Sequence, residues 1–343
     1  MKPLDALNQV AFRLERNGAD TFKVQAFRKA ARAVKDVPDD KLRALAQAGQ
    51  LQSIDGVGKS TAQVIAEALE GKVPAYLTNI DKDLTKDDLV VNGEAAELLG
   101  SLKGDCHSHS DWSDGGSPIL EMAEAARDLG REYLVLTDHS ARLTVAHGLN
   151  EERLSAQLEV VGELNEQLAP FRILTGMEVD ILEDGSLDLA LDLLSRLDVV
   201  VASVHSKLRM ESKPMTARML AAIESPHTDI LGHCTGRIIV GRGRPQSTFD
   251  ADAVFEACAR TGTAVEINSR PERQDPPEDL LRKAIEMGCS FAIDTDAHAP
   301  GQLEWLGRGC RNAVAAGVPL DRVVNRSSAD DLEAWAAAHE EAA

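Results

Sequence analysis

The chain has 343 residues, 43% apolar and 27% charged, which is the composition of an ordinary soluble globular protein with room for one large and one small domain. Its apolar stretches, such as residues 197–204, are too short to span a membrane, and its first residues lack the apolar core of a signal peptide. The net charge of −19 is uneven: residues 1–72 hold 12 Lys and Arg against 9 Asp and Glu, a net +3, and the acidic remainder, at −22, repels polyanions unless bound cations intervene.

The five cysteines are scattered along the chain, and no two of them form a CxxC pair. They are Cys106, Cys234, Cys258, Cys289 and Cys310. An odd number at such spacing argues against a disulfide framework and against a thiolate zinc site. We therefore expect a reducing compartment, the cytoplasm.

The first segment reads as a set of helices that ends in a glycine-flanked turn. Residues 4–35 place apolar side chains at helical spacing, and the run IDGVGKSTAQVIAEALEG puts Gly56, Val57 and Gly58 before a further helix that begins near Lys59. Two glycines around one apolar residue let consecutive backbone N–H groups point outward at a helix N-terminus, which suits a phosphate. The alternative is a plain tight turn between core helices.

The pattern changes after residue 72. Residues 73–102, which contain NIDKDLTKDD, lack strong periodicity and read as a polar linker. Beyond them, short β-rich runs alternate with polar or helical sequence, at residues 133–139, 171–181, 197–205, 228–233, 263–269 and 289–298. This alternation predicts a parallel α/β sheet or barrel.

Metal-competent side chains stand at the ends of these runs. In GDCHSHSDWSDG, two histidines lie two positions apart, so a strand would point both the same way. The full set is His107, His109, Asp114, His139, Glu178, His205, His233, Asp296 and His298. One such histidine alone is commonly a capping or core residue. Nine at the carboxyl ends of successive parallel strands meet on one face, and they predict a metal site.

The motifs CHSHS, LTDHS, GMEVDI, ASVHS, GHCTGR, EINSRPER and DTDAH resemble those of the PHP (polymerase and histidinol phosphatase) domain, above all the one in bacterial family X DNA polymerases. Residues 1–72 resemble that family's helix-hairpin-helix domain. The resemblance implies a small all-α domain at 1–72, a linker at 73–102 and a distorted (βα)7 PHP barrel at 103–343. The polymerase palm of that family has no room within the linker, so we expect no polymerase activity.

The resemblance also implies two to three divalent ions, with one ligand set for each of three positions. The sets are His107, His109, Glu178 and Asp296; Glu178, His205 and His233; and Asp114, His139 and His298. Imidazole and carboxylate without thiolate suit zinc, manganese or iron. Such ions activate a water and stabilise the oxygens of a phosphoryl displacement, so no protein nucleophile is required.

Arginines in the motif loops are candidates for holding a substrate phosphate. Arg237 and Arg273 lie in GHCTGR and EINSRPER, and their guanidinium groups can fork onto phosphate, which makes them catalytic candidates together with Glu178. The alternative is a salt bridge within the barrel. Arg270 and Lys207 are further candidates of the same kind.

Three other residues near the motifs have open roles. Cys234 follows His233 where the family more usually has proline, and we expect it not to ligate a metal. Asp138 and Asp294 either orient ligating imidazoles or make ordinary hydrogen bonds at strand ends.

These features favour a metal-dependent phosphoric ester hydrolase, a 3′–5′ exonuclease or DNA 3′-end processing enzyme of DNA repair that uses metal-activated water and holds the DNA backbone with Gly56, Val57, Gly58 and Lys59. Two alternatives stay open: a small-molecule phosphomonoesterase of the histidinol phosphatase kind, and a non-catalytic DNA-binding scaffold. In polymerases with a related hairpin, a lysine six residues after the second glycine cleaves abasic sites. Here that position is Val64, so we expect no Schiff-base lyase.

Overall fold

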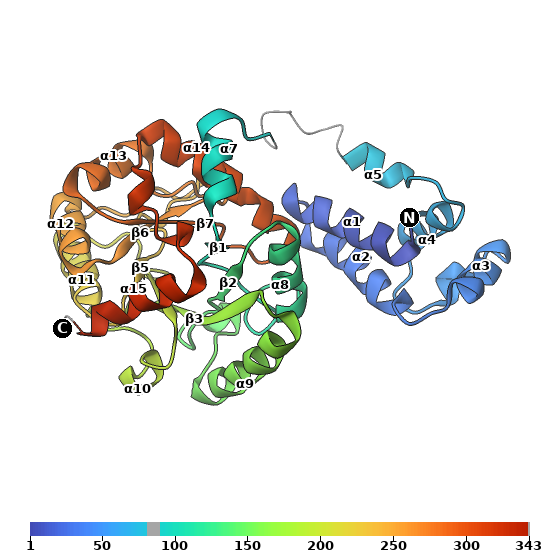
Figure 1. Ribbon diagram of the computed structural model, residues 1–343, viewed down its shortest axis with the longest axis horizontal. Helices are drawn as coiled ribbons and strands as arrows, with labels where there is room; N and C mark the ends of the chain where they lie inside the picture. The colour runs from blue at the N-terminus through green and yellow to red at the C-terminus, as the bar shows by residue number, and fades with distance from the viewer. Residues whose placement is uncertain (81–89, 342–343) are drawn as a thin grey trace. The chain divides into compact units, whose positions relative to one another are not determined.

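The computed structural model describes residues 1–80 and 90–341 (Figure 1). The chain divides into two compact units: residues 1–90 grouped with 299–302, and residues 91–298 with 303–343. The first is helical and the second is an α/β barrel. Among the described residues, no helix combines the length and the apolar character needed to cross a membrane.

The N-terminal unit is a helical bundle around its own apolar core. Its elements are α1 (Pro3–Arg16), α2 (Thr21–Val34), α3 (Asp39–Gln47), the 3-10 turn η1 (Leu51–Ser53), α4 (Lys59–Leu69) and α5 (Ala75–Ile80). The helical spacing predicted over residues 4–35 is confirmed, since one face of each helix is buried in a shared cluster. Asp20 caps α2 by accepting from the Phe22 N–H at 2.9 Å. Inside the bundle, Arg28 donates to both carboxylate oxygens of Glu15 at 2.7 Å, so each buried charge has a partner.

The segment predicted to be a polar linker contains helices at both of its ends. Residues 75–80 form α5, and Leu77 is buried in the core of the N-terminal unit. Residues 93–101 form α7 (Gly93–Ser101), whose Ala95 and Leu98 are buried in the core of the barrel unit. A few buried apolar side chains thus settle these short helices, although the sequence shows no long periodic pattern. Most of the run NIDKDLTKDD lies outside the described residues.

The barrel is a seven-stranded parallel sheet in which each strand pairs with the next one along the chain. Its strands are β1 (Gly104–Asp105), β2 (Tyr133–Leu136), β3 (Arg172–Asp180), β4 (Val199–Ser203), β5 (Ile230–Leu231), β6 (Ala264–Asn268) and β7 (Phe291–Asp294). A parallel bridge between Ser108 and Ala297 brings the first and last strands together at their carboxyl ends. The predicted α/β barrel is confirmed.

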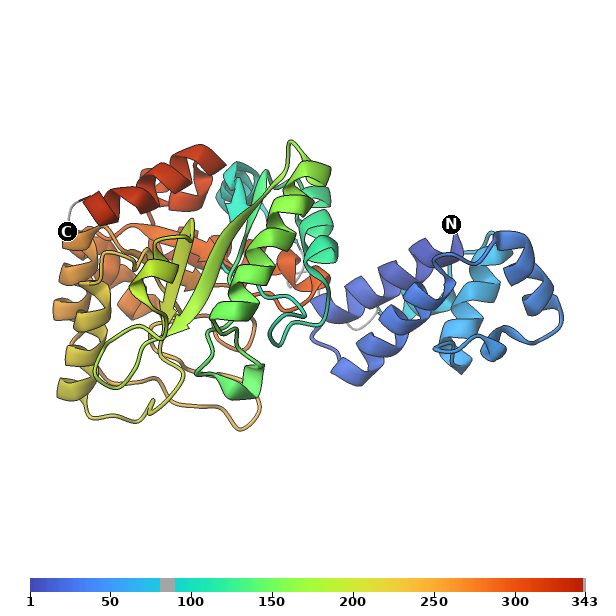
Figure 2. The ribbon, with the colours of Figure 1, turned by 90° about the horizontal axis from the view of Figure 1, so that it is seen from below.

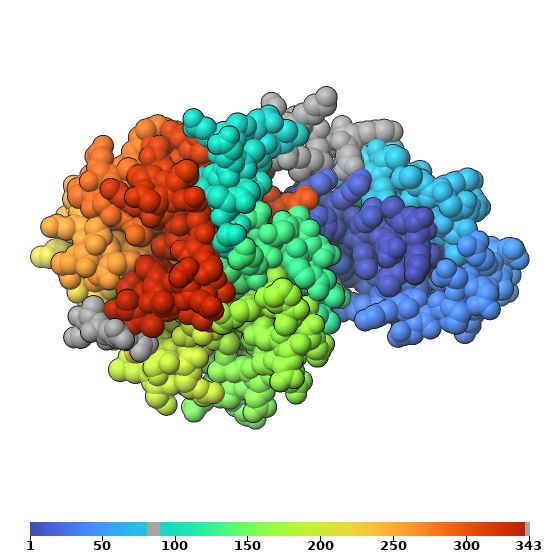
Figure 3. Space-filling model, viewed as in Figure 1, coloured from blue at the N-terminus to red at the C-terminus, as the bar shows by residue number. Residues whose placement is uncertain are grey.

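Helices surround the sheet, with α8 and α9 beside β2 and β3 and with α11 to α14 around β4 to β7 (Figures 1 and 2). Their bounds, with the short 3-10 turns, are α8 (Ile119–Asp128), η3 (Thr144–Ala146), α9 (Glu151–Leu168), α10 (Leu191–Leu194), α11 (Ser212–Ile223), α12 (Ala251–Thr261), α13 (Glu278–Met287), η4 (Pro300–Trp305), α14 (Leu306–Ala316), η5 (Leu320–Arg322), η6 (Val324–Arg326) and α15 (Ala329–Glu341). In the space-filling view, α7 lies against α14 (Figure 3), and Leu98 shares an apolar cluster with Leu306.

Alternation along each strand separates the inside of the barrel from the outside. Tyr133 and Val135 of β2 share one apolar cluster with Val201 of β4, whereas Leu134 and Leu136 pack in another cluster with α8. The inner cluster includes Leu332 of α15, so this helix contributes to the apolar filling of the barrel. Toward the carboxyl ends of the strands, the inward-facing positions are occupied by polar side chains.

Candidate metal centre

The nine predicted ligands gather at the carboxyl ends of the strands. On β3, inward positions two residues apart lead from Leu174 to Glu178, and on β4 they lead from Val201 to His205, two residues beyond the strand. The other ligands also follow strands directly: His107 and His109 follow β1, His139 follows β2, His233 follows β5, and Asp296 and His298 follow β7. The histidine pair lies beyond the short β1, yet the two rings lie close together, tilted by 53° with centroids 5.1 Å apart.

Glu178 lies at the middle of the cluster. Its carboxylate is 1% exposed, and imidazole nitrogens approach both of its oxygens. On Oε1 the neighbours are His233 Nε2 at 2.9 Å and His205 Nε2 at 3.1 Å; on Oε2 they are His139 Nδ1 at 2.9 Å, His107 Nε2 at 3.3 Å and His109 Nε2 at 3.6 Å. This one carboxylate therefore touches ligands that the resemblance assigns to different ions.

A second gathering lies around Asp114, the most exposed of the nine side chains. Its Oδ1 is 3.3 Å from His298 Nε2 and 3.5 Å from His139 Nε2. The ring of His109 lies between them, with centroids 4.4 Å from His139 and 4.2 Å from His298. These four residues each offer a ligand atom within 4.8 Å of the others, as do two further groups: His107 with His109 and Glu178, and His139 with Glu178 and His205.

The polar atoms of this cluster that lack hydrogen-bond partners among the described residues are suited to binding a metal ion. Several of its buried polar atoms have no hydrogen-bond partner within the described parts of the chain, namely His107 Nε2, both nitrogens of His109 and His205, His233 Nδ1 and both oxygens of Glu178. Their close approaches are therefore contacts without hydrogen-bond geometry. Buried polar groups left unpaired are costly, and a cation that accepts their lone pairs removes that cost.

Electrostatics favour the metal-binding forms of three groups. Burial raises the pKa of the Glu178 carboxyl, but the surrounding imidazoles, His205 first, outweigh burial and hold that pKa well below its usual range. Burial acts the same way on Asp296, and Arg270 leads the charges that bring its pKa well below the ordinary value. The pKa of His109 is well below its usual value because of burial and then its imidazole neighbours. Ionised carboxylates and neutral imidazole are the states that ligate metals.

Two other imidazoles carry protons in the metal-free protein. Burial lowers the pKa of His205, but the charge of Glu178 outweighs burial and raises this pKa to about 9. The pKa of His107 is raised well above its usual value against the same burial, and Glu178 is again the leading cause. A metal that enters must displace these protons, so its binding releases protons to solvent.

Two carboxylates that the sequence reading missed hold ligating histidines from behind. Glu266 of β6 is fully buried, and its Oε1 lies 2.6 Å from His107 Nδ1. Its Oε2 accepts from the backbone N–H of His233, so one side chain supports two ligands. Asp180 accepts from the backbone N–H of His205 at 3.1 Å and lies 3.5 Å from its Nδ1, without hydrogen-bond geometry to the ring. Such partners fix the ring orientation of a ligating histidine.

The alternation of inward and outward side chains along a strand could have identified these carboxylates from the sequence. In AVEIN the glutamate alternates with outward apolar residues, as Glu178 does in GMEVD. Asp138 and Asp294, for which the sequence left two roles open, make strand-end hydrogen bonds and do not orient a ligating imidazole. Asp138 accepts from the Ser110 N–H at 2.8 Å and from other groups of the loop after β1, and Asp294 accepts from the Cys106 N–H at 2.8 Å.

The thiol of Cys234 has turned away from the ligands. Its Sγ lies 3.8 Å from Asp275 Oδ1, and burial raises its pKa well above the usual value, which keeps the group a neutral thiol. Cys106 is fully buried and packs with Tyr133 in the barrel interior.

Arginines line one side of the centre. Arg273 Nε lies 3.2 Å from Asp296 Oδ2, and its Nη1 is buried without a hydrogen-bond partner among the described residues. Arg270 donates from Nη1 to the Asp296 carbonyl at 2.9 Å and contacts His298 Nδ1 at 2.9 Å. Arg237 lies behind them, because its Nε donates to the Arg273 carbonyl at 3.0 Å and its Nη2 to the carbonyl of Gln274.

Access to the centre is one-sided. The side chains of Asp114, His298 and His205 are 36%, 19% and 11% exposed, whereas Glu178 and His107 are 1% and 0% exposed. Solvent therefore reaches the cluster over the more exposed side chains, and the buried ones lie behind them.

In the N-terminal unit, the predicted glycine turn precedes α4 but uses its N–H groups differently than expected. Gly56 has a positive φ of 87°, and Gly58 is the N-cap of α4. The Val57 N–H donates to the Ile54 carbonyl at 3.0 Å and the Gly58 N–H to Thr61 Oγ1 at 2.9 Å, so neither points outward. The N–H groups left over at a helix start belong to its first turn, from Lys59 onward. Val57 is buried, whereas Gly58 and Lys59 are exposed.

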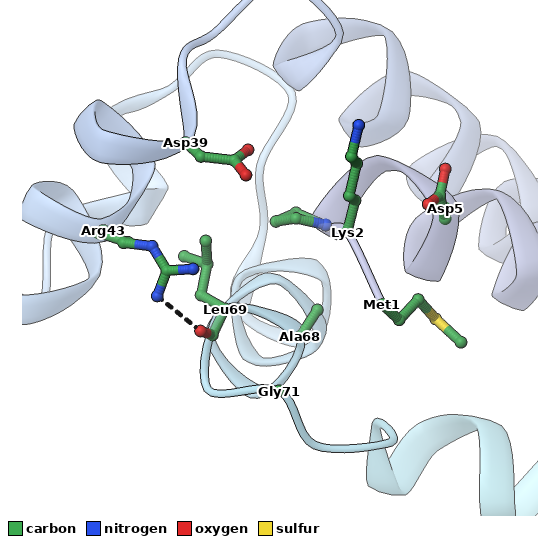
Figure 4. Close-up of a pocket in the computed structure, with 9 residues that line it drawn as sticks. Met1, Lys2, Asp5, Asp39, Arg43, Ala68, Leu69 and Gly71 are labelled. Carbon is green, nitrogen blue, oxygen red and sulfur yellow. Dashed lines mark hydrogen bonds between the residues drawn. The ribbon is translucent and has the colours of Figure 1, made fainter.

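A hollow of about 470 Å³ in the same unit shows no metal-binding character (Figure 4). It is lined by Met1, Lys2, Pro3, Asp5, Asp39, Arg43, Ala68, Leu69 and Gly71. Arg43 spans one wall and donates to the Leu69 carbonyl at 2.8 Å. Neither histidine nor cysteine lines it, and its one arginine ties α3 to α4.

Comparison with known proteins agrees with this geometry. Family models match residues 2–73 as a helix-hairpin-helix domain and residues 105–270 as a PHP domain. DNA polymerase/3′-5′ exonuclease PolX of Bacillus subtilis is 42% identical over 237 residues, which cover 69% of this chain and 41% of that protein. A probable phosphatase of Thermoanaerobacter sp. strain X514 is 30% identical over 235 residues, which cover 64% of this chain and 89% of that protein.

A solved structure of histidinol phosphate phosphatase from Lactococcus lactis, complexed with zinc, L-histidinol and phosphate, aligns with a TM-score of 0.44 and 18% identity, over 63% of this chain and 94% of that chain. The barrel and its histidine and carboxylate cluster define a protein with a multi-ligand metal centre on a parallel α/β scaffold. The chain belongs to the PHP domain family and carries an N-terminal helix-hairpin-helix domain.

Proposed function

We propose that this protein is a metal-dependent phosphoric ester hydrolase that acts on the 3′ end of DNA. The observation that carries the proposal is the convergence of five imidazoles on the two oxygens of buried Glu178, beside a helix-hairpin-helix domain in the same chain. The relative from B. subtilis, named as a polymerase and 3′-5′ exonuclease, supports the reaction class. The chain spans 41% of that relative's length.

Two to three divalent ions of zinc, manganese or iron would be held by the nine ligands in the three sets given above, with Glu178 shared between two of them. Bound there, they supply an activated water and neutralise charge on the phosphoryl oxygens. The chain itself positions the ester. Arg273 offers the unpaired Nη1 to a phosphate oxygen, and Arg237 holds the backbone of the Arg273 loop and so aims that guanidinium.

The N-terminal domain would hold the DNA backbone through the start of α4. Lys59 is exposed there, next to the exposed Gly58, and the first-turn N–H groups favour an anion. Contacts of this kind read phosphates and not bases, so binding is independent of sequence. The five cysteines of the chain are unpaired and buried, which supports the cytoplasm as its place of action.

A small-molecule phosphomonoesterase is the second candidate. The one-sided access to the centre and the net charge of −22 outside residues 1–72 favour a small substrate over a polyanion. The probable phosphatase of Thermoanaerobacter also supports it. A catalytically silent scaffold fits less well, because all nine ligand positions are filled and face one another.

One experiment separates these candidates. Purified, manganese-loaded protein is incubated with a 3′-labelled oligonucleotide and, separately, with histidinol phosphate. The proposal expects shortening of the oligonucleotide from its 3′ end, and that this activity is lost in the Glu178→Gln variant. Hydrolysis of histidinol phosphate alone would establish the phosphomonoesterase, and no hydrolysis of either substrate would favour the scaffold.

A further inference from the structure

Four of the loops that surround the metal centre each carry charge of a single sign. Residues 110–118 after β1 and 181–190 after β3 hold five acidic and no basic residues. Residues 206–210 after β4 and 236–247 after β5 hold five basic and no acidic residues. In a unit whose net charge is strongly negative, such a segregated positive edge marks where an anion is attracted.

The loop after β5 folds into a hairpin that displays part of this positive edge. Ile238 and Arg244 pair through N–H to O=C bonds of 2.9 and 2.8 Å, and the Gly243 N–H donates to the Val240 carbonyl at 3.0 Å. Gly241 and Gly243 have φ values of 62° and 65°, which glycine adopts without the cost that a side chain would add. The tight tip that results is built into the sequence RIIVGRGR.

The tip of the hairpin carries apolar side chains in solvent. Ile239 and Val240 are 49% and 50% exposed, although adjacent β-branched residues normally pack against a neighbour. Arg242 follows them, and no hydrogen bond or ion pair within the described residues engages it or the exposed Arg209 of the neighbouring loop. An apolar pair beside unpaired guanidinium groups fits a ligand that has both flat apolar groups and repeated negative charge.

The hairpin is anchored to the centre and not free to swing. The Ile239 N–H donates to the Glu272 carbonyl at 2.8 Å, and Arg237 donates to the Arg273 carbonyl, so the loops after β5 and β6 are joined. Ser247 Oγ donates to the Leu208 carbonyl at 2.8 Å and joins the loop after β4. The same segment begins just beyond His233. A ligand seated on the hairpin is therefore held in a fixed relation to the ligands and to Arg273.

We infer that Lys207, Arg209, Arg242 and Arg244, with the apolar pair Ile239 and Val240, form a track for a single strand of nucleic acid whose terminal phosphodiester enters the metal centre. We call these residues the basic rim. This inference rests on the proposed hydrolase function. A phosphomonoester has one phosphate, which the centre and Arg273 satisfy, whereas four additional cations and an exposed apolar pair match the repeating phosphates and bases of a strand.

The rim also answers the charge objection to a DNA substrate. The acidic loops after β1 and β3 repel the strand, and the rim attracts it toward the loops after β4 and β5; the two groups meet at Lys207, whose Nζ lies 3.9 Å from Glu183 Oε1. Net charge alone does not reveal this, because the five basic and five acidic loop residues cancel in the sum.

The test removes rim charge at exposed positions outside the metal centre. The double variant Arg209→Ala, Arg242→Ala is compared with wild type and with the control Arg196→Ala, Arg260→Ala. This control makes the same charge change at exposed positions that precede β4 and β6 and so lie at the opposite end of the barrel. For each protein, kcat/KM is measured on a 3′-labelled single-stranded oligonucleotide over a series of salt concentrations, and on histidinol phosphate.

Each phosphate contact on a single strand contributes about 0.7 to the slope of log kcat/KM against log salt, so the rim variant should lose about 1.4 from that slope. Its activity on histidinol phosphate should equal that of wild type, and the control should match wild type on both substrates. A rim variant with the wild-type slope and oligonucleotide rate, while wild type cleaves DNA, would overturn the rim but leave the hydrolase standing. A wild-type protein that hydrolyses histidinol phosphate and not DNA would also overturn the rim.

The apolar pair is tested by a separate variant. Ile239→Ser, Val240→Ser keeps every charge, so the salt slope should be unchanged while KM for the oligonucleotide rises by about tenfold, since apolar area buried against a base is lost. An unchanged KM would exclude these side chains from the track. Because both are exposed, a folding defect is not expected, and circular dichroism checks this.

Discussion

Replacing Glu266 by glutamine tests whether the metal centre depends on a residue that belongs to none of the three ligand sets. Its carboxylate lies 2.6 Å from His107 Nδ1, with both side chains fully buried, and it also accepts from the His233 N–H. A hydrogen bond to a charged group contributes about 1.5–3 kcal/mol. Since about 1.4 kcal/mol corresponds to tenfold in binding, zinc affinity should fall by about 10- to 100-fold, the range typical of such outer partners.

The assay is zinc competition against a fluorescent chelator, with metal-free protein as the starting material. Glu256→Gln is the matched control, because it makes the same chemical change at an exposed position of α12. Thermal melts of the metal-free variants show whether a loss of affinity comes from a loss of folding. If Glu266→Gln binds zinc as tightly as Glu256→Gln, the carboxylate does not orient His107, and the short contact is only a structural feature of the barrel.

Five further results are expected. Glu178→Gln removes the carboxylate shared by two ligand sets and should reduce turnover more than any other single ligand change. A variant that keeps over about a tenth of the wild-type rate, so that the activation barrier rises by less than about 1.4 kcal/mol, contradicts this sharing. Protein purified without chelator should hold two or three metal ions per chain, and less than one ion per chain refutes the centre. Zinc binding should release protons, and zinc affinity should increase as pH rises toward the His205 pKa of about 9. Calorimetry in buffers of different ionisation enthalpy measures the number of protons released. Gly58→Ala should weaken DNA binding and leave histidinol phosphate hydrolysis unchanged, with Gly100→Ala as the control. The substitution itself is tolerated, because the added Cβ meets no atom within 4 Å and φ at Gly58 is ordinary. If Gly58→Ala binds DNA as tightly as wild type, the hairpin is only structural. Borohydride should trap no covalent complex with abasic DNA in the presence of a chelator, because Val64 is fully buried and apolar; a trapped complex would move chemistry to the N-terminal domain.

Much of the fold and the ligand set followed from periodicity. Six strands were predicted from β-rich runs, and each ligand named from sequence lies within β3 or shortly after a strand. The two-residue β1 is too short to show a period, yet the motif around His107 located it. The helices α5 and α7 escaped prediction because only a few apolar side chains, such as Leu77 and Leu98, settle each of them.

Contacts between distant loops were beyond the reach of the sequence. Glu266 could be placed on an inward face by alternation, but its pairing with His107 spans 159 positions and depends on β6 and β1 lying at the same mouth. The N–H groups of the glycine turn were assigned outward because the sequence does not show that Ile54 and Thr61 accept them. Arg237 likewise reads as a free phosphate ligand until its carbonyl acceptors are seen.

The origin of the ligands along the chain ties metal uptake to the last stages of folding. The group around Asp114 needs His109 and Asp114 from just after β1 and His298 from just after β7, which are joined only when Ser108 pairs with Ala297. During synthesis, a ribosome must therefore release residue 298 before this position can exist, whereas the helical N-terminal unit draws its core from the first eighty residues. A nascent or truncated barrel would lack this position, and metal bound there would report that the ring of strands has closed.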